Sequence, residues 1–215
     1  MSAYAPAPAP VSYIYRDEYL ILIDKPSGLL SVPGRGAEKA DCAIARVQAE
    51  FPDALTVHRL DMATSGLLLV ARGKEMQRAL SGLFERGEVE KSYLADVWGA
   101  PAPASGEIDL PLITDWPNRP LQKVDHDIGK PSRTLYETLA VSGGNARLKL
   151  TPLTGRSHQL RVHLAAIGHP ILGDEFYAAG DALAARERLA LHAARLAFTH
   201  PATGERMAFE APCPF

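Results

Sequence analysis

The sequence has only two cysteines, Cys42 and Cys213, and they lie far apart in its 215 residues. Two such residues make neither a disulfide framework nor the paired spacing of a zinc site. A reducing compartment, the cytoplasm, is therefore the expected location. The chain also lacks an apolar run of transmembrane length and a charged-then-apolar leader, so we expect no membrane partner.

Basic charge is not in excess either. The 23 lysines and arginines face 25 aspartates and glutamates, which gives a formal net charge of −2. That balance does not indicate a nucleic-acid partner, although the local charge matters more than the total charge. Between residues 116 and 165, eight cations oppose three carboxylates, so this stretch carries +5 and the remainder −7. The stretch is therefore a candidate for contacts with phosphate groups.

Three kinds of catalytic motif are missing. His158 and His163 stand about 140° apart round a helix, and no cysteine or carboxylate nearby completes a tetrahedral metal site. No G-x-S-x-G nucleophile elbow occurs. Gly34-Arg35-Gly36 lacks the third glycine and the following helix of a phosphate-binding loop. We expect neither a metal nor a nucleotide cofactor.

What is present is typical of one globular domain, with 47% apolar and 22% charged residues. Residues 1–12 contain alternating alanine and proline and predict a flexible tail, which leaves 13–215 as a single domain.

The apolar patterns predict isolated helices and hairpins without repeats, which favours an α+β fold. Strands are expected near 19–23, 67–71, 91–98, 133–141, 146–150, 194–199 and 206–210. Helices are expected near 41–51, 76–86 and 157–167, with Asp41 and either Thr154 or Ser157 as N-caps. Residues 111–133 predict a long loop-like excursion.

The central motif is the stretch 58–66, His-Arg-Leu-Asp-Met-Ala-Thr-Ser-Gly, which runs directly into the apolar residues 67–71. Asp61 and the residues after it favour a turn, and the apolar run predicts a strand buried on both faces. A carboxylate on a loop held by a central strand is a frequent arrangement for catalytic residues. Local chemistry favours a catalytic Asp61 and a merely turn-forming one about equally.

A second candidate is Arg161, near the start of the predicted helix 157–167. An arginine there opposes the helix dipole, so we look for another reason for its presence. One reason is a partner carboxylate such as Asp61, which the guanidinium would keep ionised and oriented. The alternative is a solvated helix face, which accounts for most arginines.

The sequence resembles the RluA-type pseudouridine synthases in several blocks that follow the family's order. These blocks are residues 58–66, 91–95, 154–163, 168–174, 191–193 and 200–205. They extend over the chain from about residue 13 to the end. Residues 116–120 and 129–131 resemble the dual-specificity members, which act on tRNA and 23S rRNA. We expect no N-terminal S4 RNA-binding domain.

The resemblance implies a mixed, mostly antiparallel sheet with flanking helices and a central active-site cleft. It assigns the catalytic carboxylate to Asp61, the base-stacking tyrosine to Tyr93 and the aspartate-paired arginine to Arg161. Arg59 matches the residue that takes the space of a flipped uridine. No metal or redox cofactor is needed for such a reaction.

We therefore expect an isomerase that converts uridines of structured RNA to pseudouridine, in a tRNA anticodon stem-loop and a 23S rRNA hairpin. Tyr93, Trp116 and Tyr136 are available for base stacking. Further RNA contacts are expected from Arg119, Lys130 and Arg156. The expected protein is a monomer. The alternative is a non-catalytic RNA-binding module or RNA chaperone on the same fold.

Overall fold

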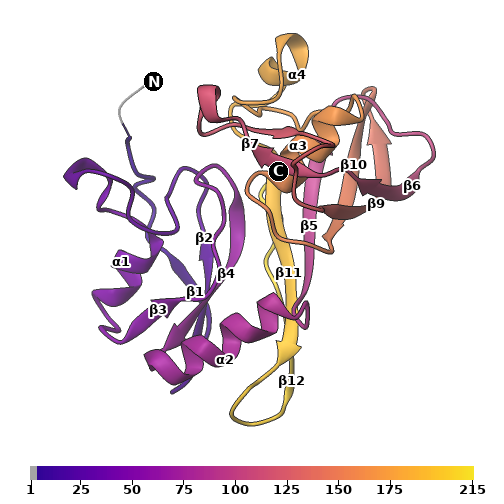
Figure 1. Cartoon of the computed structure of the whole chain (residues 1–215). Helices are drawn as coiled ribbons and strands as arrows, with labels where there is room; N and C mark the ends of the chain where they lie inside the picture. Colours follow the sequence, from indigo (N-terminus) through magenta and orange to yellow (C-terminus); the bar gives the residue numbers. More distant parts are fainter. Residues whose placement is uncertain (1–3) are drawn as a thin grey trace. The chain divides into compact units, whose positions relative to one another are not determined.

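The computed structural model describes residues 4–215, so the first three residues of the predicted tail lie outside the described part (Figure 1). The chain divides into two compact units. The first unit contains the residues up to Lys91 together with Ala193–Pro214, and the second contains Ser92–His192 with Phe215. Each unit is described separately below.

The first unit contains a sheet in the order β1-β2-β4-β11, with β12 paired to β11 and β3 to β4. Its strands are β1 (Ser12–Arg16), β2 (Leu20–Lys25), β3 (Ala54–Thr56), β4 (Ser65–Arg72), β11 (Leu191–Thr199, of which Ala193 onward belongs here) and β12 (Arg206–Glu210). The pairs β1–β2, β2–β4, β3–β4 and β11–β12 are antiparallel. Seven of the eight residues of β4 are buried, which confirms the doubly buried strand predicted from the apolar run.

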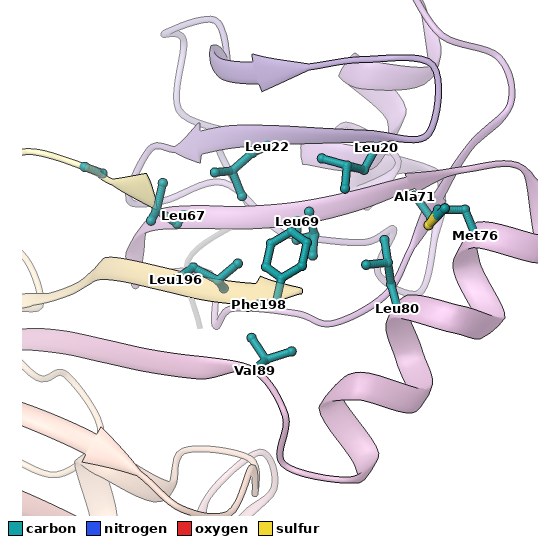
Figure 2. Packing of buried hydrophobic residues seen from close by; sticks show 11 residues of the cluster. Leu20, Leu22, Leu67, Leu69, Ala71, Met76, Leu80, Val89, Leu196 and Phe198 are labelled. Carbon is teal, nitrogen blue, oxygen red and sulfur yellow. The ribbon is translucent and has the colours of Figure 1, made fainter. Parts of the chain in front are cut away.

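The core of this unit forms where one face of the sheet meets helix α2 (Gly73–Glu85). The helix places Met76 and Leu80 against the strands because these residues are four positions apart and share a face. Figure 2 shows them beside Ala71, with the Phe198 ring close to Leu69. Each fully buried side chain of this size contributes roughly 1.5–3 kcal/mol. The helix predicted from the spacing of Met76 and its apolar neighbours is confirmed.

Two short helices precede this core, η1 (Ala37–Lys39) and α1 (Ala43–Gln48). The prediction that Asp41 caps a helix over 41–51 was wrong. The N-cap is Cys42 and makes no side-chain cap hydrogen bond. The Asp41 carboxylate instead accepts two hydrogen bonds of 2.7 Å from Arg46, because a bidentate guanidinium is a stronger donor than a backbone amide.

The second unit contains the strand order β5-β10-β9-β6, with antiparallel pairing throughout. The strands are β5 (Glu90–Val97, of which Ser92 onward belongs here), β6 (Ser105–Asp109), β9 (Arg133–Ser142) and β10 (Asn145–Pro152). Gly143 and Gly144 connect β9 and β10 with φ of 57° and 79°, a conformation that favours glycine. The predicted hairpin is confirmed.

The excursion over 111–133 is more ordered than the sequence predicted. It contains β7 (Leu112–Thr114), η2 (Trp116–Asn118) and β8 (Gln122–Val124), and β7 pairs with β8 in a two-stranded sheet. A loop-like stretch was expected because these strands have three residues each, too few for a recognisable alternation.

The remaining helices are α3 (Gln159–Ala166) and α4 (Gly180–Ala184). Neither Thr154 nor Ser157 caps α3, so both predicted caps were wrong. The N-cap is His158, at φ 54° and without a side-chain cap bond. The Thr154 hydroxyl donates to Gln159 Oε1 at 2.8 Å, and the Arg156 N–H donates to the same oxygen at 3.0 Å. A glutamine inside the first turn thus ties down the chain that enters the helix.

These elements confirm a mixed α+β fold with a mostly antiparallel sheet and few helices. No helix within residues 4–215 combines the length and the apolar character needed to cross a membrane.

Candidate active site

Asp61 lies on the loop between β3 and β4, in the first unit. Its side chain is half-buried and the neighbouring Arg59 is exposed. The Thr64 N–H donates to the Asp61 carbonyl at 3.1 Å, so the stretch does form the predicted turn. At the end of the turn, Gly66 has φ +111°, and a Cβ there would stand 2.3 Å from the Ala193 carbonyl oxygen. Only glycine fits this close approach.

The last residue of β2 and two residues after it hold the loop just beyond Asp61. Lys25 is fully buried, and its Nζ donates to the Met62 carbonyl at 3.1 Å. The Gly28 N–H donates to the same carbonyl at 2.9 Å. The Ser27 hydroxyl donates to the next carbonyl, that of Ala63, at 2.7 Å. Because the Lys25 ammonium also donates to carbonyls of its own turn, it joins that turn rigidly to the loop.

Ser31 holds the loop just before Asp61. Its side chain is buried, and its hydroxyl donates to the Leu60 carbonyl at 2.7 Å while accepting the Leu60 N–H at 3.0 Å. A single hydroxyl thus satisfies both backbone groups of Leu60, much as a neighbouring strand would. Lys25, Ser27 and Ser31 were not predicted as site residues. The only signal in the sequence was that a lysine and two serines stand at and after the end of the apolar strand β2.

His58, the first residue of the motif, anchors the loop rather than acting at its tip. Its Nε2 accepts the Leu69 N–H at 2.9 Å, and its ring stacks on Phe84 at 4.4 Å between centroids. Burial and the nearby Lys91 charge lower the pKa of His58 to about 3. A neutral imidazole is required for Nε2 to accept this bond, so the low pKa and the geometry agree.

Arg161 lies on α3 in the second unit and is only 3% exposed, so the solvated-face alternative is wrong. Its Nε and Nη2 donate to the two carboxylate oxygens of Asp174 at 2.8 and 2.6 Å. The guanidinium carbon also lies 4.9 Å from the Phe176 ring centroid and 5.3 Å from that of Tyr177. The arginine is therefore held by a carboxylate and two aromatic rings.

Asp174 is itself fully buried and was missed by the sequence analysis. Besides the two guanidinium bonds, its Oδ1 accepts the N–H groups of Phe176 and Tyr177 at 2.9 and 3.3 Å. The same carboxylate thus orients the guanidinium and the two rings that cover it. The signal was an aspartate next to two aromatic residues within a block that resembled the family, but nothing local linked it to Arg161.

Two histidines of the same helix region take part in hydrogen bonds within the second unit. His158 Nδ1 lies 2.7 Å from the Tyr177 hydroxyl, which also accepts the Gln122 N–H of β8 at 2.9 Å. His163 is buried between Thr134 and the Leu110 carbonyl, and burial lowers the pKa of His163. Within residues 4–215, no group of three histidine, cysteine or acidic side chains could hold a metal ion.

Tyr93 lies on β5, opposite Leu150 of β10, with a half-buried side chain. Asp61 and Arg59 belong to the first unit, whereas Tyr93 and Arg161 belong to the second. The pairing of Arg161 with Asp61 therefore stays a prediction.

Besides Arg59, three cations are predicted to contact RNA, and these are exposed in the second unit: Arg119, Lys130 and Arg156. Arg119 stacks over the exposed Trp116 ring at 4.9 Å. Arg156 donates to the Pro131 carbonyl at 3.4 Å, next to Lys130. Among the described residues, none of the three cations has a carboxylate within 4 Å.

The local charge of +5 between residues 116 and 165 overstates what RNA would meet. Three of its arginines are paired with carboxylates from outside that stretch. The pairs are Arg133 with Glu107, Arg147 with Asp96, and Arg161 with Asp174. These carboxylates lie outside residues 116–165, so the charge count over that stretch did not include them. In the described chain, the exposed Arg119, Lys130 and Arg156 have no carboxylate partner, and neither does Lys149 of β10.

Comparison with known proteins shows the family to which the chain belongs. A family model described as RNA pseudouridylate synthase matches residues 19–166, and the chain belongs to this family. The chain is 52% identical over 217 residues to the dual-specificity RNA pseudouridine synthase RluA of Escherichia coli (strain K12), covering 100% of this chain and 99% of that protein. Residues 19–166 include Asp61, Tyr93 and Arg161.

Solved structures agree. Human RNA pseudouridylate synthase domain containing 1 matches with a TM-score of 0.78 and 27% identity, over 100% of this chain and 86% of that one. Human RNA pseudouridylate synthase domain containing 4 matches with a TM-score of 0.75 and 25% identity, over 94% and 88%.

Proposed function

We propose that this protein is an isomerase that converts specific uridines of structured RNA into pseudouridine. The N-glycosidic bond between uracil and ribose breaks, and a carbon–carbon bond forms in its place. The ring carbon loses its proton and the released ring nitrogen gains one, so nothing is added to or removed from the RNA. The observation that carries the proposal is the Asp61 loop, held on both sides of the carboxylate inside a chain of this family.

Asp61 is the proposed reactive group. Breaking a glycosidic bond needs a nucleophile or a negative charge placed against the reacting atoms, and an oriented carboxylate supplies either. The contacts to Leu60, Met62 and Ala63 keep the loop from relaxing when RNA binds. A preorganised charge costs no rearrangement at the moment of reaction.

Arg161 and Tyr93 are the proposed supports of the reaction. Arg161 is the proposed partner of the Asp61 carboxylate, and Asp174 holds the Arg161 guanidinium in one orientation. Tyr93 is the ring on which the target base stacks. These assignments follow the family resemblance at the matching positions.

Reaching a uridine within a stacked RNA requires its extrusion, which costs a few kcal/mol. Arg59 is exposed beside Asp61 and is the proposed side chain that fills the vacated space. The exposed Arg119, Lys130 and Arg156 are proposed to bind phosphates, since each keeps its charge without a carboxylate partner among the described residues.

For the substrates, we propose a tRNA anticodon stem-loop and a 23S rRNA hairpin. The support is the similarity to an enzyme named as having dual specificity for RNA. We also propose that the protein acts as a monomeric catalytic domain in the cytoplasm, without a metal or cofactor.

The test is tritium release from RNA that contains 5-tritiated uridine, compared between the wild type and Asp61→Asn. We expect release by the wild type and none by the variant, with RNA affinity retained. Release by Asp61→Asn at the wild-type rate would show that Asp61 is not the reactive group. RNA binding by the wild type without any release would favour the non-catalytic RNA-binding module.

A further inference from the structure

The alanine- and proline-rich N-terminal segment is attached to the first unit by polar contacts. The Tyr4 hydroxyl donates to the Asp41 carbonyl at 2.9 Å and accepts the Leu30 N–H at 3.2 Å. Arg46 of α1 donates to the Ala7 and Ala9 carbonyls at 2.8 and 2.6 Å. An extended alanine–proline segment has no internal hydrogen bonds, so its carbonyls are available as acceptors.

Asp41 and Leu30, which contact Tyr4, also form hydrogen bonds to residues of α1. The Asp41 carboxylate occupies the other edge of the Arg46 guanidinium, at 2.7 Å for both bonds. The Leu30 carbonyl accepts the Ala43 N–H at 2.8 Å, one of the first amides of α1, which have no partner inside the helix. The Tyr4 hydroxyl and the start of the helix therefore hold Leu30 through its N–H and its carbonyl.

The next residue along the chain is Ser31, whose hydroxyl binds both backbone groups of Leu60. Leu60 directly precedes Asp61. A continuous series of contacts thus runs from Tyr4 through Leu30 and Ser31 to the residue before the proposed reactive carboxylate. All of these residues belong to the first unit.

We propose that residues 4–9 form a strap that positions the Asp61 loop, with Tyr4 and Ser31 as positioning residues. The inference rests on the proposed function for its effect on turnover. Tyr4 acts on the loop through Leu30 and Ser31. Removing the Tyr4 hydroxyl leaves the Leu30 N–H without its acceptor, so the turn that presents Ser31 to Leu60 loosens.

The experiment compares Tyr4→Phe, Ser31→Ala and the double variant with the wild type in the full-length chain. The matched control is Tyr15→Phe, which removes a hydroxyl bonded at 2.9 Å to Asp17, a residue of the same unit outside residues 57–64. The measurements are kcat and KM on an RNA stem-loop and amide hydrogen exchange of residues 57–64.

We expect Tyr4→Phe to lower kcat roughly fivefold, the factor for one neutral hydrogen bond, with KM unchanged. Exchange of the loop amides should quicken in Tyr4→Phe and stay at the wild-type rate in Tyr15→Phe. Ser31→Ala should have a larger effect, and adding Tyr4→Phe to it should cause no further loss, since both act along one path.

The strap is refuted if loop exchange in Tyr4→Phe matches the wild type, or if the two losses in kcat multiply in the double variant. An equal effect of Tyr15→Phe would also refute it, since that result indicates general loosening of the unit. If the wild-type protein forms no pseudouridine, the proposed function fails, and the exchange measurement still decides the strap.

Discussion

The buried ion pair between Arg161 and Asp174 leads to a quantitative prediction about folding stability. Asp174 has no exposed surface, and its carboxylate accepts four hydrogen bonds, two from the guanidinium and two from backbone amides. We expect Asp174→Ala to lower the free energy of unfolding by about 3–5 kcal/mol, because a buried charge loses its partner. Asp174→Asn should cost less, since the amide oxygen can still accept the backbone N–H groups.

The assay is urea unfolding, with the free energy obtained by linear extrapolation and the slope compared between variants. Glu88→Ala is the control, because it breaks an exposed pair with Arg86, of 2.8 Å, and exposed pairs contribute little. A loss for Asp174→Ala no larger than the loss for Glu88→Ala would refute the reasoning. Tritium release by Asp174→Asn at the wild-type rate would show that the Asp174 charge is not needed to orient Arg161.

The other predictions concern the loop and the RNA surface. Lys25→Met leaves the Pro26 and Leu29 carbonyls without their donor, while the Met62 carbonyl keeps the Gly28 N–H. We expect about 1–3 kcal/mol lower stability for each of the two acceptors left unsatisfied, and a lower kcat, measured by urea unfolding and tritium release. Burial holds the pKa of His58 at about 3, so between pH 6.5 and 3 the unfolded chain binds a proton that the native chain does not. Stability should therefore fall as the pH drops through that window, by up to about 1.4 kcal/mol per pH unit from this group. His58→Gln should reduce that slope in urea titrations at several pH values, and an unchanged slope would contradict the assignment. Arg119→Ala should weaken RNA binding and reduce its salt slope by about one, measured by fluorescence anisotropy, if Arg119 contacts a phosphate.

Much of the first unit could be predicted from local sequence. The apolar run after Gly66 has the length of a strand and no polar interruption, and β4 is buried along almost its whole length. The spacing of Met76 and Leu80 likewise defines the buried face of α2. In both cases the periodicity of the element coincides with the side that meets the core, so no long-range information is needed.

The predictions failed where a polar side chain had a choice of partners. Asp41, Thr154 and Ser157 have the chemistry of N-caps, yet none caps a helix. Asp41 binds Arg46, and Thr154 binds Gln159, through contacts that a rule based on the helix start does not consider. Short-range capping bonds contribute about 1 kcal/mol. A bidentate ion pair, or a hydrogen bond to a second side chain, can therefore replace the capping bond.

The candidate site was predicted unevenly for a related reason. Asp61 and Arg161 could be proposed because they lie in blocks that resemble a family. Their supports, Ser31 and Asp174, could not, because each reaches its partner across an interval in which the sequence shows no period. A hydroxyl or a carboxylate that binds a distant residue leaves no local pattern.

The supports of the Asp61 loop are polar, and this has a physical reason. Apolar packing is non-directional and would hold the loop near the core without fixing its orientation. Hydrogen bonds fix both distance and angle. Lys25, Ser27 and Ser31 bind the Met62, Ala63 and Leu60 carbonyls, which lie on either side of Asp61. These contacts set the path of the chain through its backbone. A buried lysine is tolerated here because three carbonyls replace the water it loses. Its bond to Met62 ties the turn after β2 to the loop, where a displacement of the carboxylate would slow the reaction.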